Sequence, residues 1–217
     1  MEKSITVTGS ASVTLTADLC TVEMTVEEKN KDYGKATDSM NEKLGLLRKA
    51  CAENGLGKEL KTTSYNVRAD YVGVNENGIY KNVFDGYVCS YGLSLSFDFD
   101  ADKLASLLSA VSSCGSSARV NVSFSVKDPA AAEAQLLEAV CDDAKKKAET
   151  ICRRLDAYMG KLIRVQQGGG AHSMRSRTEY GCDNQMPQLA KSAAFSPDIT
   201  PSDITVTSEA VFEWEIL

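Results

Sequence analysis

The chain has 217 residues, 43% of them hydrophobic and 25% charged, with a formal net charge of −6. This suits a globular protein with a sizeable core, as one domain over residues 1–217 or two intertwined lobes. The acidic balance disfavours nucleic acids and anionic membrane surfaces as partners. No apolar run approaches the roughly 20 residues of a membrane helix, so membrane insertion is not expected.

The stretch from Ser4 to Val26 predicts two strands with Gly9 inside the first. Apolar residues alternate after this glycine, through Val13 and then Val22. A phosphate-binding loop would lead from its glycines directly into a helix, whereas here a second strand follows. We therefore interpret Gly9 as a bulge or bend between two strand segments.

Three helices are predicted from apolar residues at helical spacing. The first ends at Gly55, the second is capped by Asp100 and ends at Gly115, and the third starts at Pro129 and continues to about residue 159. The expected core faces are Tyr33, Ala36, Met40, Leu44, Leu47 and Cys51; then Leu104, Leu107, Leu108 and Val111; then Leu137, Cys141, Ala144, Ala148, Ile151, Leu155 and Tyr158.

Strands complete the pattern. Alternating residues predict them at about 65–71, 87–99, 120–126, 162–165 and 204–216, and an Asn-Gly pair in VNENGIYKN marks a hairpin turn. The order is ββ-α-ββ-α-β-α-β-β, an α+β protein with three helices on mixed or antiparallel sheets. A weak strand–helix–strand repeat covers about 20–71 and 87–126. Residues 166–203, rich in glycine and proline, predict a long mobile loop.

Several motifs resemble one known family. The opening ITVTGSASVTLTADLCTVEMTVE, the passage ENGLGKELKTTSYNVRADY, the strand GYVCSYGLSLSF and the helix EAVCDDAKKKAETICRRLDAYMGKLIRV are similar to SIMPL-domain proteins. Ala144, Lys147 and Ala148 match the Ala-x-x-Lys-Ala pattern of the family's long helix. The similarity covers nearly the whole chain.

The resemblance implies a bacterial protein, mostly periplasmic or secreted, linked to stress tolerance or to envelope or signalling partners. Some members form large ring-like homo-oligomers, and no agreed catalytic residues can be carried over. The start MEKSITVTGS lacks the apolar segment of a signal peptide, and seven cysteines are many for an exported protein. The compartment therefore stays open.

Candidate chemistry is sparse. The lone histidine, His172, and the glycines at 168–170 sit in the predicted loop, where neither a catalytic partner nor a phosphate cradle is evident. The acidic triplet Asp98, Asp100 and Asp102 lacks the glycine and distal glutamate of a calcium loop and suits helix capping instead. The cysteines show no zinc-ligand spacing and fall mostly on apolar faces. We expect no metal and no cofactor.

Four aromatic residues form the candidate binding site. Tyr65, Tyr71, Tyr87 and Tyr91 lie on neighbouring predicted strands and could line an aromatic groove, although ordinary sheet packing explains the same pattern.

Three functions remain open. The first is a non-catalytic protein that associates with itself, as a homo-oligomer, or with a protein partner. Its long opening and terminal strands, 5–26 and 204–217, are expected to leave a sheet edge for self-association. The second is a small-molecule binder that uses the aromatic face, which requires an enclosed pocket. The third is a thiol redox enzyme, which requires an exposed cysteine of low pKa.

Overall fold

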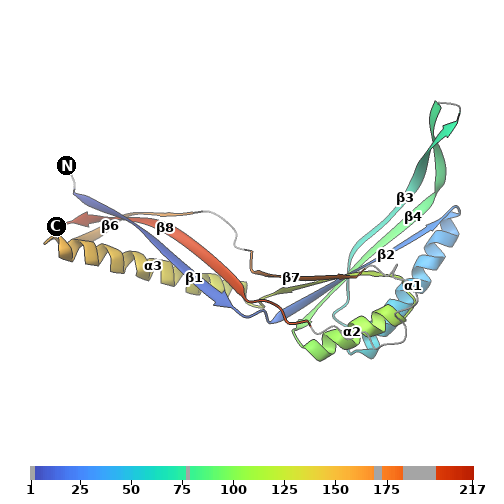
Figure 1. The fold of residues 1–217 in the computed structure, drawn as a ribbon, viewed down its shortest axis with the longest axis horizontal. Helices are drawn as coiled ribbons and strands as arrows, with labels where there is room; N and C mark the ends of the chain where they lie inside the picture. The colour runs from blue at the N-terminus through green and yellow to red at the C-terminus, as the bar shows by residue number, and fades with distance from the viewer. Residues whose placement is uncertain (1–2, 77–78, 169–172, 183–198) are drawn as a thin grey trace. The chain divides into compact units, whose positions relative to one another are not determined.

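The computed structural model describes residues 3–76, 79–168, 173–182 and 199–217 (Figure 1). Within them the chain forms three helices and eight strands in two sheets, which confirms the predicted α+β class. The elements are β1 (Ser4–Leu15), β2 (Leu19–Asn30), α1 (Tyr33–Glu53), β3 (Lys61–Glu76), β4 (Ile79–Asp98), α2 (Ala101–Ser113), β5 (Arg119–Ser125), α3 (Pro129–Arg154), β6 (Met159–Gln167), β7 (Arg175–Cys182) and β8 (Ile204–Ile216).

The chain divides into two compact units. Unit 1 comprises Met1–Ala17, Ser125–Arg177 and Ser202–Leu217, and unit 2 comprises Asp18–Phe124 and Thr178–Pro201. In each unit a helix packs against the unit's own sheet, because a sheet with one apolar face must bury that face against another layer.

Unit 1 is built on a three-stranded sheet in the order β1-β8-β6, with α3 packed on it. Its core is apolar, with the residues Val7, Val140, Ala144, Ala148, Ala210, Phe212 and Trp214. β8 lies in the centre of this sheet and offers no free edge, contrary to expectation. The opening stretch 5–26 forms two strands, and of these β1 is an edge strand, as expected, whereas β2 lies inside the other sheet. The edges of the unit 1 sheet are β1 and β6.

The interpretation of Gly9 as a bulge or bend is wrong. β1 runs without interruption through Gly9, which pairs with Ala210 in a register that shows no shift from Ser4 to Leu15. The reason for the glycine is the helix above it. A Cβ atom at this position would lie 2.3 Å from the backbone oxygen of Val140 and 2.8 Å from the Cβ of Ala144.

The predicted core face of α3 is also partly wrong. Ala144 and Ala148 are buried as expected, but the other predicted residues of this face are exposed and α3 already ends at Arg154. The exposed ones are Leu137, Cys141, Ile151, Leu155 and Tyr158. The buried residues follow a spacing of four, through Ala132, Leu136, Val140, Ala144, Ala148 and Cys152. Alternating spacings of four and three selected the wrong leucine, because two apolar residues stand side by side at 136 and 137.

Unit 2 contains the five-stranded sheet, in the order β3-β4-β2-β5-β7. Asp32, Asp100 and Asp128 accept hydrogen bonds from backbone N–H groups at the starts of α1, α2 and α3, which confirms the predicted Asp100 cap. Gly55 and Gly115 follow α1 and α2 with φ values of +72° and +78°, as left-handed helix stops require. The buried residues of α2 are the four predicted, whereas Tyr33 of α1 is 53% exposed.

The segment 166–203 is not one continuous loop. β6 extends to Gln167, and Arg175–Cys182 forms β7 beside β5. This strand has no apolar alternation to reveal it, and its buried Ser176 instead donates a hydrogen bond to the Ser202 carbonyl oxygen, at 2.8 Å. Residues 169–172 and 183–198, and with them the expected mobility there, lie outside the described residues. So do Asn77 and Gly78 of the predicted hairpin turn.

Candidate functional site

The four predicted tyrosines lie on one face of the β3–β4 hairpin in unit 2. The strand register places Tyr65 opposite Tyr91 and Ala69 opposite Tyr87, and opposite residues of an antiparallel pair point to the same side. A shift of register between Asp70 and Tyr71 then places Tyr71 opposite Phe84. The sequence therefore identified residues that share a face, and it missed the ring between Tyr71 and Tyr87.

Ring contacts join these side chains in two groups and add Tyr33 from the start of α1. Tyr33 lies edge-on to Tyr87 with centroids 5.5 Å apart, and Phe84 lies 5.2 Å from Tyr87 and 5.9 Å from Tyr71. The Tyr65 and Tyr91 rings are 5.5 Å apart. These separations are typical of favourable aromatic pairs. We call this set the aromatic surface: Tyr33, Tyr65, Tyr71, Phe84, Tyr87 and Tyr91.

The aromatic surface is open. Tyr65 and Tyr71 are 56% and 59% exposed, and Tyr33 and Phe84 also keep much of their surface in contact with solvent. In Figure 1 the outer part of the β3–β4 hairpin extends past the start of α1, so this helix does not cover it. Contiguous exposed apolar groups are more often found at interaction sites than elsewhere on a surface, so the aromatic surface is the candidate site.

The missed residues have a physical explanation. Asp85 is the extra residue of the bulge in β4, so Phe84 takes the face that strict alternation from Tyr87 would assign to Asp85. Tyr33 fits the predicted helical stripe, but it stands in the first turn, where α1 approaches the end of β2. The apolar spacing of a helix does not show whether an aromatic residue in its first turn is buried in the core or exposed at its edge.

Charged side chains hold the base of the hairpin. Lys29 of β2 contacts Asp85 and, at 2.8 Å, Asp70, while Arg68 lies 3.6 Å from Asp70. The hydrogen bonds to Asp70 and Asp85 raise the pKa of Lys29, and the hydrogen bond from Lys29 lowers the pKa of Asp70. Exposed ion pairs stabilise little, so we expect this cluster to contribute little to the stability of the fold.

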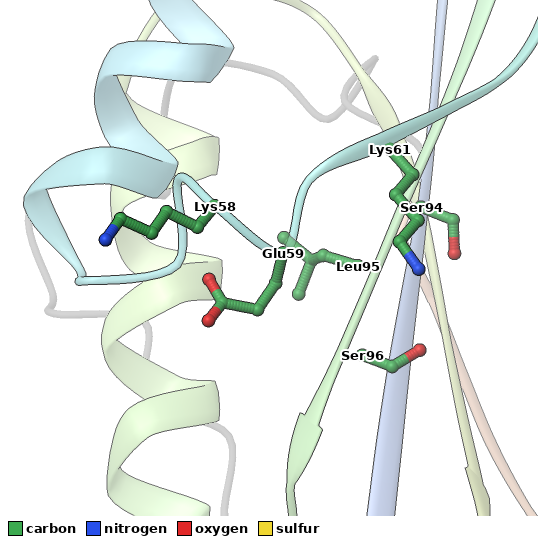
Figure 2. A pocket seen from close by; sticks show the side chains of 6 residues that line it. All are labelled: Lys58, Glu59, Lys61, Ser94, Leu95 and Ser96. Atoms are coloured by element: carbon green, nitrogen blue, oxygen red, sulfur yellow. The ribbon is translucent and has the colours of Figure 1, made fainter.

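A hollow in the surface of unit 2 lies away from the aromatic surface. It measures about 300 Å³ and is lined by the residues labelled in Figure 2, Lys58, Glu59, Lys61, Ser94, Leu95 and Ser96. Lys58 extends away from the strands, and Ser96 already shares a hydrogen bond of 2.9 Å with Thr21. Its polar groups do not converge on a common point, so the hollow is no candidate site for a bound small molecule.

The remaining candidates give little chemistry. Asp100 caps α2, and within the described residues no group of three His, Cys, Asp or Glu side chains could hold a metal ion. Burial raises the pKa of the Cys20 thiol to about 12 and that of Cys51 to about 11, which suppresses the reactive thiolate. His172 and the side chain of Cys182 lie outside the described residues.

Comparison with known families decides the classification. The family model named SIMPL, described as "Protein of unknown function (DUF541)", matches residues 5–214. The chain belongs to the SIMPL family. The description of the SIMPL family assigns no reaction and no ligand, and no curated protein matches this SIMPL chain. In the described part of the chain, no helix is long and apolar enough to cross a membrane.

Proposed function

We propose that this SIMPL protein acts by association and not by catalysis, and that the aromatic surface joins two copies of the chain. The observation that carries the proposal is a row of contacting rings, Tyr71, Phe84, Tyr87 and Tyr33, all of which except the half-buried Tyr87 are exposed. Burying such rings against a partner removes a large apolar area from water, and aromatic residues are enriched at the centres of protein interfaces.

The edge of the sheet supports the same contact. β3 is the outermost strand of its sheet and extends over 16 residues, so its outer N–H and C=O groups can pair with another strand. β1, in contrast, is protected: its Ser10 N–H donates to Asp143 at 2.8 Å, and its Thr8 carbonyl accepts from Lys147 at 3.1 Å. Edge pairing is therefore blocked in the middle of β1 and open along β3.

The charges of β3 are self-complementary. An antiparallel pairing of two β3 strands centred on Ala69 would bring Arg68 of each copy opposite Asp70 of the other. The same pairing continues the face that carries Tyr65 and Tyr71 from one copy into the next. A two-fold axis of this kind is the commonest symmetry of homo-oligomers.

The alternative functions receive less support. A small-molecule site requires enclosing walls, whereas four of the six rings of the aromatic surface are exposed to solvent. A thiol redox site requires an accessible thiolate. Of the described cysteines, Cys20, Cys51, Cys89 and Cys152 are buried, which leaves Cys141 as the exposed thiol that such a site could use.

Light scattering coupled to size exclusion tests the proposal. The wild-type protein should show a multiple of the 23.4 kDa chain mass. Tyr71→Ser combined with Phe84→Ser should shift it toward the mass of one chain. Tyr80→Ser is the matched control, because Tyr80 is 80% exposed on the same hairpin but belongs to none of the ring contacts described above. A wild-type mass of one chain, unchanged on concentration, would overturn the proposal.

A further inference from the structure

A second uncovered surface lies in unit 1, where α3 ends. The Tyr158 N–H donates to the Leu217 carbonyl oxygen at 3.0 Å, and the Leu217 N–H donates to the Tyr158 carbonyl oxygen at 2.9 Å. The Ile216 N–H donates to the carbonyl oxygen of Lys3, also at 2.9 Å. These bonds join the α3–β6 connection, the end of β8 and the start of β1, which meet at one end of the unit in Figure 1. We call this end the tip.

The tip projects apolar side chains into solvent. Tyr158 is 77%, Leu155 72% and Leu217 70% exposed, far more than the apolar residues along the flanks of α3. Leu155 follows the last helical residue, and Asp156 then turns the chain with a φ of +54°, which directs Leu155 and Tyr158 away from the core of unit 1.

Basic side chains surround these apolar ones. Arg153 and Arg154 form the last turn of α3, Lys161 lies near the start of β6, and all three are exposed. Among the described residues, none of the three has an acidic partner within ion-pair distance. Lys3, whose carbonyl oxygen binds Ile216, adds a fourth positive charge. Asp156 and Glu215 contribute two negative ones, so the tip is locally basic on a chain whose net charge is −6.

We propose that the tip binds the surface of an anionic lipid bilayer. Leucine and tyrosine side chains that project singly can enter the headgroup layer, where tyrosine is enriched, while the arginine and lysine side chains remain at the anionic lipid phosphates. A protein partner would instead favour side chains packed into a continuous surface, as on the aromatic surface of unit 2. The attachment is peripheral and spans nothing. The negative net charge disfavours anionic membranes as partners, and the proposal departs from that expectation for the tip alone.

Vesicle flotation of the whole chain tests the tip. Wild-type protein should float with vesicles of phosphatidylcholine mixed with phosphatidylglycerol, should remain behind with phosphatidylcholine alone, and should be released by salt. Leu155→Ser combined with Tyr158→Ser, and Arg153→Glu combined with Arg154→Glu, should each weaken binding at least about tenfold. Lys145→Glu combined with Lys146→Glu is the matched control, with the same charge change on exposed residues in the middle of α3.

Three outcomes would overturn the proposal. The first is that the wild-type protein does not float with anionic vesicles. The second is that the Lys145/Lys146 control loses as much vesicle binding as the tip variants. The third is that both tip variants bind vesicles as well as the wild-type protein does. A fall in the solution mass of the Leu155/Tyr158 variant without loss of vesicle binding would assign the tip to a protein contact instead. Circular dichroism of each variant establishes that it is folded. The aromatic-surface variant Tyr71→Ser with Phe84→Ser should bind vesicles as an unassociated chain, which separates this result from the proposed self-association.

Discussion

Gly9 of β1 and Ala144 of α3 lie so close together that no side chain fits at position 9. A Cβ atom built on Gly9 would be 2.8 Å from the Cβ of Ala144, and 2.3 Å from the carbonyl oxygen of Val140 one turn earlier. Both contacts involve parts of the helix that cannot rotate away. The distance between helix and sheet in unit 1 is therefore set by the smallest pair of residues available.

Gly9→Ala should destabilise unit 1 because α3 must move away from the sheet to admit the methyl group. Overpacking of a tight core costs about 1–3 kcal/mol, and a backbone oxygen in the way places this site at the upper end. Urea unfolding followed by circular dichroism measures the change. Gly168→Ala is the control in the same unit, where the nearest atom to an added Cβ lies 3.8 Å away. Equal stability of the Gly9 variant and wild type would mean that α3 packs elsewhere.

Leu136 and Leu137 give a direct test of how α3 is oriented. Leu136 is 2% exposed and Leu137 is 43% exposed. Leu136→Ala should lower the free energy of unfolding by about 2–5 kcal/mol, through lost burial and the cavity left behind. Leu137→Ala should cost less than about 1 kcal/mol, as surface changes usually do. A larger loss of stability for Leu137→Ala than for Leu136→Ala would show that the buried face of α3 is the one predicted from the sequence.

The success of the sequence prediction depended on how clear the local signal was. α2 was predicted residue by residue, because Asp100 caps it, Gly115 ends it, and a single apolar stripe lies between them. α3 failed where Leu136 and Leu137 offered two stripes and only the packing against β1 decides between them. β7 was missed because its burial depends on Ser176 and Ser202, which carry no hydrophobic period. Gly9 was misread because close approach between layers is invisible in a single strand.

The candidate site was half predictable for a similar reason. Period-two alternation correctly gathered Tyr65, Tyr71, Tyr87 and Tyr91 on one face. The bulge at Asp85, which brings in Phe84, depends on the pairing of β3 with β4 and has no local signal. The local positive charge of the tip could not be predicted from the net charge, because the net charge is a sum over the whole chain and does not show where the basic side chains gather.

Most thiols should be protected in the folded chain. Cys20, Cys51, Cys89 and Cys152 are buried, whereas Cys141 is exposed. In a Cys182→Ser background at pH 8, a thiol reagent should label Cys141 rapidly, and the buried four should react only after denaturant is added. The raised pKa values of Cys20, about 12, and Cys51, about 11, further slow their reaction, which requires the thiolate. Cys141→Ser should remove the fast phase, and rapid labelling of four or more native thiols would support the redox alternative.

Asp143 should make unit 1 sensitive to acid. Its carboxylate accepts hydrogen bonds from Lys147 at 2.6 Å and from the backbone N–H of Ser10 at 2.8 Å, and these bonds lower its pKa below the ordinary 3.8. A group whose pKa is lower in the folded state stabilises the fold above its unfolded pKa, and that contribution disappears as the pH falls through the folded value. The loss should therefore begin near pH 4 and increase below it. Asp143→Asn should flatten this part of the stability curve measured by urea unfolding, and Asp142→Asn, with the same charge change one residue earlier, should leave it steep. An identical acid dependence of wild type and Asp143→Asn would mean that the carboxylate does not hold the edge of β1.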